Sequence, residues 1–166
     1  MAGIADVAGV SRQTVYNEFG TKHGLAQQLA LRELQRFLAV VTERMNGETD
    51  LVAGIRAACE GALLMGEQSL IVRTLVGSLP DEHDPELLQI LTTESGDIID
   101  SAVAGVKQTI VDRYEQPFTE AELSVAVEVV VRLVLSAITR PSKPPAEAAA
   151  DIAWVVGLAF KGAVGA

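Results

Sequence analysis

A tight turn between two short helical segments near the N-terminus constrains the fold of this chain more than any other feature. Ile4, Ala5 and Ala8 form a small apolar face at helical spacing. Gly9 follows, and glycine is the residue that most easily takes the positive φ that ends a helix abruptly. Ser11 can then cap a second helix through its hydroxyl. The spacing therefore predicts a helix-turn-helix whose small residues let the two helices cross closely.

The second helix of this motif separates polar from apolar side chains. We expect Val10 and Val15 to face the first helix. The polar residues of its first turn would then face outward, where they can reach base edges or phosphates in a DNA major groove: Arg12, Gln13 and Thr14. Residues 11–16 are thus predicted to be a DNA recognition helix. The alternative is an ordinary helical hairpin with no role at DNA.

The residues after this helix distinguish between helix-turn-helix families. Tyr16 and Phe19 flank Asn17 and Glu18, and Lys22 follows Thr21 at the start of a long helical run. This arrangement resembles the TetR (tetracycline-repressor) family of ligand-responsive transcription regulators, over about the first quarter of the chain. In that family an aromatic pair closes the recognition helix and a lysine opens the next helix beside the DNA backbone. The residues that the motif and the resemblance assign to DNA are Ser11, Arg12, Gln13, Thr14, Tyr16, Asn17, Lys22 and His23.

The chain departs from the family pattern at its beginning. Members of the family carry another helix before the residues that match Ile4, and here only residues 1–3 precede them. That helix normally completes the small core of the head. We expect a truncated start rather than a degraded DNA-binding head, because loss of function would have eroded the recognition helix as well.

Charge is divided unevenly along the chain. The formal net charge is -9, but the first 44 residues hold five basic and four acidic residues, whereas the remainder holds eight basic and eighteen acidic. A near-neutral head can approach phosphate, and an acidic body is repelled by it. This distribution fits a DNA-binding head on a body that stays away from DNA.

Glycine, proline and acidic clusters interrupt a chain that otherwise has helical periodicity, with no sustained strand pattern. The fold class is therefore predicted to be all-α. We place the head at residues 1–45 and a ligand-binding and dimerisation domain at 46–166. The expected helices of the second domain span about 51–65, 68–78, 85–114, 119–139 and 146–163. No leader or membrane-spanning run is recognisable, which predicts a soluble cytoplasmic protein.

The last two helices are predicted to form a dimer interface. Thr119 and Glu122 form a capping-box pattern, and the helix that follows is apolar on too wide a face for one neighbour. The family resemblance implies that two such helices from each subunit make a four-helix bundle. The residues expected there are Leu123, Val127, Val130, Val134, Ile152, Ala153, Val156 and Phe160. A monomeric antiparallel hairpin is the alternative.

The resemblance also implies a ligand pocket between the middle helices. Nearly all the side chains expected to line it are apolar, which predicts a lipophilic effector, and each could instead be core: Cys59, Leu63, Met65, Val72, Arg73, Thr74, Leu75, Leu79, Leu88 and Leu91. Gly54, Gly61 and Gly66 would loosen the helix that carries the first of these residues, at about 1 kcal/mol each relative to alanine.

The sequence contains no recognisable constellation of catalytic residues. His83 among acidic neighbours is better explained as a solvated loop than as a metal site, the only cysteine is Cys59, and no phosphate-binding glycine loop occurs. We therefore expect no enzyme, no metal and no cofactor. The predicted function is a homodimeric transcriptional regulator, a repressor released from a palindromic operator by a lipophilic small molecule. The alternative is a dimeric small-molecule-binding protein that has lost DNA binding.

Overall fold

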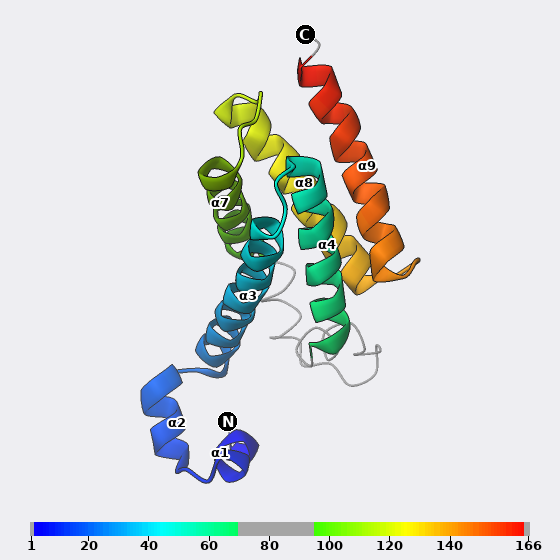
Figure 1. The fold of residues 1–166 in the computed structure, drawn as a ribbon. Helices are drawn as coiled ribbons and strands as arrows, with labels where there is room; N and C mark the ends of the chain where they lie inside the picture. The colour runs from blue at the N-terminus through cyan, green and yellow to red at the C-terminus, as the bar shows by residue number, and fades with distance from the viewer. Residues whose placement is uncertain (1, 70–94, 165–166) are drawn as a thin grey trace.

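The computed structural model describes residues 2–69 and 95–164, and within these residues the chain forms helices and no strand (Figure 1). The all-α prediction is confirmed. The helices are α1 (Ala2–Ala8), α2 (Arg12–Phe19), α3 (Lys22–Asn46), α4 (Leu51–Gln68), α7 (Ser95–Arg113), α8 (Glu120–Thr139) and α9 (Pro145–Val164). The expected helix over 68–78 and the first part of the one expected over 85–114 lie outside the described residues.

Side-chain caps fix where several helices begin. The carboxylate of Asp50 accepts the backbone N–H of Ala53, and the hydroxyl of Thr21 accepts that of Gly24, at 2.9 Å each. At the start of α8, Thr119 accepts from the N–H of Glu122 while the Glu122 carboxylate accepts from the N–H of Thr119. The predicted capping box is therefore present, and these hydrogen bonds hold the pKa of Glu122 below its usual value.

The helices divide into a small head and a larger body (Figure 1). Helices α1 and α2 form the head at one end, and α3 runs from the head into the body beside α4 and α7. α4 also packs on α8 and α9, which lie on the side of the body away from α3. One continuous helix of 25 residues, about 37 Å long, therefore connects the head to the body.

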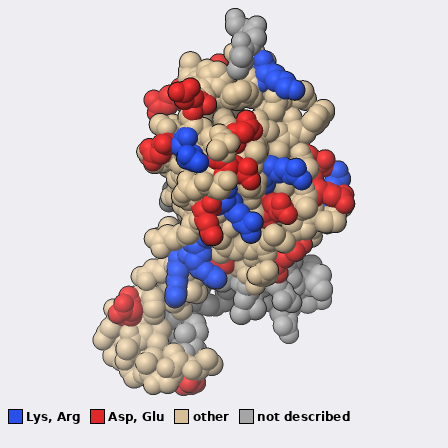
Figure 2. Space-filling model, in the orientation of Figure 1, with Lys and Arg blue, Asp and Glu red and all other residues tan. Residues whose placement is uncertain are grey.

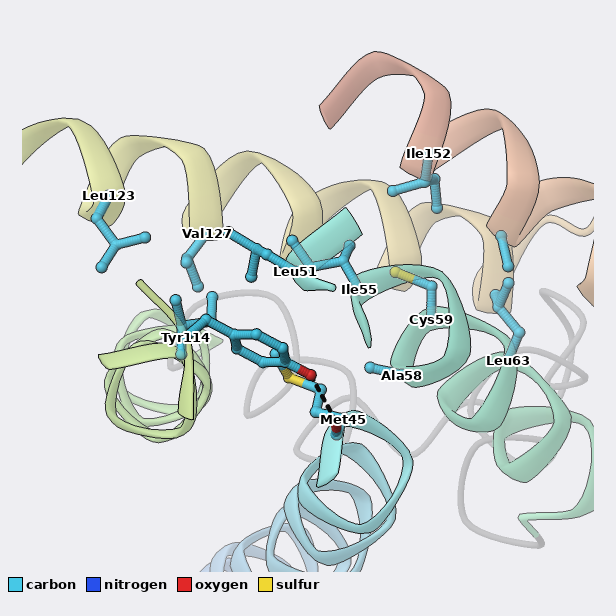
Figure 3. Close-up of a cluster of buried hydrophobic side chains, with 12 residues drawn as sticks. Met45, Leu51, Ile55, Ala58, Cys59, Leu63, Tyr114, Leu123, Val127 and Ile152 are labelled. Carbon is cyan, nitrogen blue, oxygen red and sulfur yellow. Dashed lines mark hydrogen bonds between the residues drawn. The ribbon is translucent and has the colours of Figure 1, made fainter. Parts of the chain in front are cut away.

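The core of the body is built from one face of each helix around α4 (Figure 3). Met45 at the end of α3 and Ile110 on α7 are almost completely buried. The other buried members of this cluster are Leu51, Ile55, Ala58, Cys59, Leu63, Tyr114, Leu123, Val127, Ala149 and Ile152. Apolar burial of this kind contributes about 1.5–3 kcal/mol per large side chain, so these contacts hold the body together.

Tyr114, just after α7, ties three helices together (Figure 3). Its hydroxyl donates to the backbone carbonyls of Met45 and, at 3.3 Å, of Glu48, which lie at and just after the end of α3. The ring lies against Gly54 of α4, where an added Cβ would fall 2.3 Å from the tyrosine oxygen. The absence of a side chain at Gly54 therefore makes room for a hydrogen bond that caps α3.

The glycines of α4 serve close packing. A Cβ at Gly61 would lie 3.0 Å from the Val40 side chain of α3, and one at Gly66 would lie 2.8 Å from Ile138 of α8. The prediction that these glycines loosen α4 considers only the helix propensity of glycine. In the fold each of them is a position where a neighbouring helix comes within contact distance.

Burial makes Cys59 unreactive. Its side chain is 3% exposed in the core, and desolvation raises the pKa of the thiol to about 12. We expect a thiol reagent at pH 8 to modify Cys59 only after unfolding, as measured by reagent absorbance with and without denaturant.

The same shift predicts a pH dependence of stability. In the unfolded chain the thiol ionises near pH 9, whereas in the folded chain it stays protonated to about pH 12. The free energy of unfolding should therefore fall as the pH rises above 9. Cys59→Ala should reduce this slope, and an identical slope in both proteins would contradict the assignment.

None of the helices in the two described ranges combines the length and apolar character needed to cross a membrane.

Candidate DNA interface

The turn between α1 and α2 has the geometry that the sequence predicts. Gly9 has φ of +67°, and the chain there closes two backbone hydrogen bonds, from Val10 N to Ala5 O at 3.0 Å and from Gly9 N to Asp6 O at 3.3 Å. This is the Schellman pattern that satisfies the last carbonyls of a helix. The hydroxyl of Ser11 then caps α2 by accepting the N–H of Thr14 at 3.0 Å.

The core of the head is small. Among the described side chains of the head, Ala5, Val15 and Leu25 are buried and apolar, one from each of α1, α2 and α3, and Phe19 is half-buried. The prediction for Val15 is confirmed, but the one for Val10 is wrong, because its side chain is 43% exposed. Val10 lies in the extended turn before the cap, where its side chain is not held against α1.

The polar residues at the start of α2 all face solvent. Ser11, Arg12, Gln13 and Thr14 are exposed, as is Asn17 one turn later. Two hydrogen bonds order them, one between the hydroxyls of Ser11 and Thr14 at 2.9 Å and one from the Gln13 Nε2 to the Asn17 Oδ1 at 2.8 Å. The structure thus gathers the predicted base-reading side chains on one ordered surface.

Two further residues assigned to DNA lie where α3 begins. Lys22 and His23 form the first turn of α3, directly after the Thr21 cap. The structure describes their backbone and not their side chains. Tyr16 is 49% exposed on α2, so its hydroxyl is available beside the same surface.

Basic and acidic side chains are interspersed over the face of the body in Figure 2, and a basic group lies where the body meets the head. The sequence places Arg32 and Arg36 on this half of α3, and both are exposed. Positive charge near the head favours approach to a phosphate backbone, although the protein as a whole is acidic.

A buried carboxylate on α3 was missed by the sequence reasoning. Glu33 is 6% exposed and accepts hydrogen bonds from the hydroxyl of Ser69, at the end of α4, and from Arg36 at 3.0 Å. The sequence carries a signal for it, because Glu33 lies at helical spacing between the apolar residues Leu29 and Phe37. Glu33 thus links the head-side half of α3 to the C-terminal end of α4.

The predicted ligand pocket is only partly within the described residues. Cys59 and Leu63 belong to the packed core, and Met65 is half-buried. Leu63 also borders a cavity of about 30 Å³ between α4 and the α8–α9 connection, which has room for only a water or two. The other predicted lining residues lie outside the described residues: Val72, Arg73, Thr74, Leu75, Leu79, Leu88 and Leu91.

The structure places half of the residues expected at a dimer interface inside the protomer. Leu123, Val127, Ile152 and Ala153 are between 3% and 7% exposed, because they pack on α4 and its neighbours. Val130, Val134, Val156 and Phe160 are half-buried beside the same core. A side chain that is already buried in its own protomer has little surface left for a partner. The first four residues therefore belong to the core of the protomer, whereas the other four keep surface that a partner can contact.

The outward faces of α8 and α9 carry a different apolar set. Val125, Val129 and Leu133 recur every fourth residue along α8 and are between 41% and 63% exposed. On α9, Trp154 and Leu158 have the same spacing and are 67% and 51% exposed. A continuous apolar strip on each helix therefore faces solvent in the single protomer.

Comparison with known proteins gives matches over both parts of the chain. A family model described as the C-terminal domain of bacterial tetracycline repressors matches residues 50–157. The HTH-type transcriptional regulator AlkX of Mycobacterium tuberculosis is 32% identical over 158 residues, which cover 94% of this chain and 72% of that protein.

A similar fold is found among solved structures. It is that of the TetR family repressor AlkX from a Dietzia strain, described as implicated in biodegradation of n-alkanes. The superposition has a TM-score of 0.77 at 23% sequence identity and covers 98% of this chain and 86% of the other.

Proposed function

Because the chain belongs to the TetR family of transcriptional regulators, we propose that it is a homodimeric repressor that an apolar small molecule releases from a palindromic operator. The observation that carries this proposal is the exposed, ordered polar surface of α2, on a head that stands apart from the body (Figure 1). A recognition helix needs such a surface to enter a major groove.

The roles of the head residues follow from their positions. Arg12, Gln13 and Thr14 lie on the first turn of α2 and read base edges or adjacent phosphates. Tyr16 and Lys22 hold the DNA backbone, which fixes register without reading sequence. A twofold dimer places two such helices in successive major grooves, about 34 Å apart.

The outward strips of α8 and α9 support the dimer. Exposed apolar strips of this kind, rimmed by charged residues such as the Glu128–Arg132 pair, are typical of surfaces that a partner covers. The occupant we propose is a second copy of the chain, because the family builds its four-helix interface from two helices of each subunit.

The effector is proposed to be apolar. The residues that the sequence assigns to the pocket are mostly aliphatic, and the related Dietzia repressor is implicated in n-alkane biodegradation. An n-alkane or a molecule with a long alkyl chain is therefore the class to test first. A ligand that shifts the end of α4 would act on α3 through Ser69 and Glu33, and the continuous α3 would carry that movement to the head.

The test uses duplexes selected from a random pool by the purified full-length protein. Gln13→Ala should reduce the preference for particular bases, at a cost of about 1–3 kcal/mol if Gln13 makes a bidentate contact with adenine. Lys22→Ala should weaken the selected and the scrambled duplex about equally and lower the salt slope by about one.

Fluorescence anisotropy over a salt series separates the two effects. If Gln13→Ala weakens all duplexes equally and Lys22→Ala changes base preference, the proposed docking of α2 is wrong. If the protein selects no sequence at all, the repressor proposal itself fails.

A further inference from the structure

A hydrogen bond between Gln13 and Asn17 restrains two side chains of the proposed recognition surface. The two residues are four apart on α2, so their side chains lie on the same face, and the Gln13 Nε2 donates to the Asn17 Oδ1 at 2.8 Å. Both side chains are exposed to solvent. The contact is made within α2 itself and involves no other helix.

We propose that Asn17 is a positioning residue that orients the amide of Gln13 for base recognition, an inference that rests on the proposed function. In this role Asn17 does not itself read a base. It holds the Gln13 side chain on one face of α2, where its amide is presented to the groove.

The hydrogen-bonding capacity of the pair supports this role. A glutamine amide has two N–H donors and one carbonyl acceptor, and Asn17 uses one of the donors. The Gln13 Oε1 and the second N–H remain free to pair with N6 and N7 of adenine. Without Asn17, the side chain of Gln13 can take other rotamers, which accommodates other bases.

The hydrogen bond to Asn17 also reduces the conformational entropy that the Gln13 side chain loses when α2 binds DNA. An exposed glutamine samples many rotamers, and freezing it at an interface costs about 0.5–1.5 kcal/mol. A side chain held in advance loses less freedom on binding. Among the described residues, the other ordered pair on this surface, Ser11 with Thr14, makes no side-chain hydrogen bond to Gln13 or Asn17, so the effect of Asn17 can be isolated.

The experiment is a double-mutant cycle on full-length protein, with duplexes that the wild type selects from a random pool. Asn17→Ala should lower the preference for adenine at the affected position about two- to tenfold, with helix content and melting temperature unchanged. In the Gln13→Ala background the same change should leave base preference unaltered, because the group that Asn17 orients is absent.

A conservative variant separates positioning from a direct contact. Asn17→Asp keeps an oxygen that accepts from Gln13, so it should preserve the adenine preference. It also places a negative charge near phosphate, so it should lower affinity for every duplex, most strongly at low salt.

Two results would overturn the inference. One is an equal loss of affinity for all duplexes in Asn17→Ala, and the other is the same change in base preference with and without Gln13. These two results leave the proposed function standing. Failure of the wild type to select any sequence would instead overturn both this inference and the proposed function, so the two kinds of failure can be told apart.

Discussion

Placing a glutamate on the outward strip of α8 or α9 should dissociate the dimer. Val129 and Trp154 are 48% and 67% exposed in the protomer, so Val129→Glu and Trp154→Glu should fold normally. In a twofold interface each substitution buries two unpaired charges, and one such charge costs about 3–5 kcal/mol. We expect the dissociation constant to rise by at least about 100-fold, as measured by sedimentation, with operator binding lost in parallel.

The chain offers a matched control and an internal reporter for this test. Val111 on α7 is 57% exposed and lies outside the strips, so Val111→Glu should remain a dimer. Trp154 is the only tryptophan, so its emission should shift to longer wavelength when the wild-type protein dissociates on dilution. A dimeric Val129→Glu or Trp154→Glu protein would exclude this face as the interface.

Adding one methyl group at Gly54 should destabilise the body. The Cβ would lie 2.3 Å from the oxygen and 2.9 Å from the Cζ of Tyr114, whose ring is buried and cannot swing aside cheaply. Overpacking of this kind costs about 1–3 kcal/mol, and loss of the hydrogen bond to Met45 adds about 1. After the gain of about 1 kcal/mol in helix propensity, we expect Gly54→Ala to lower the free energy of unfolding by about 2 kcal/mol.

Denaturant unfolding at one fixed protein concentration measures this loss, because the stability of a dimer depends on concentration. Gly157→Ala is the control, since a Cβ there meets only Val52 at an ordinary 3.7 Å, and it should be neutral or stabilising. Tyr114→Phe removes the oxygen that clashes, so Gly54→Ala should cost less in that background. An unchanged stability of Gly54→Ala would show that Tyr114 moves without loss.

Features that depend on neighbouring residues were predictable from the sequence. Gly9, Ser11 and Thr119 each act on backbone groups within a few positions, and the turn and caps that they predicted are present. The polar first turn of α2 was predictable for the same reason. A helix of eight residues with one apolar side turned to α1 must expose the other.

Features that depend on partners distant in the sequence were not predictable. Helical spacing grouped Leu123, Val127 and Ile152 as an apolar face, but spacing cannot tell whether such a face meets the protomer's own α4 or a second subunit. The position of Glu33 between apolar residues was visible in the sequence, but its partner Ser69, 36 residues away, was not.

The sequence by itself determined the described helices, their caps and the exposed polar surface of α2, because these follow from short-range hydrogen bonding and from periodicity. Only the tertiary structure decided which apolar faces are buried, that the glycines of α4 serve close packing, and that Gln13 is held by Asn17. The physical reason is that burial and side-chain pairing depend on which residue lies opposite in space. The sequence contains several apolar helix faces that could occupy that position, and their spacing alone does not distinguish between them.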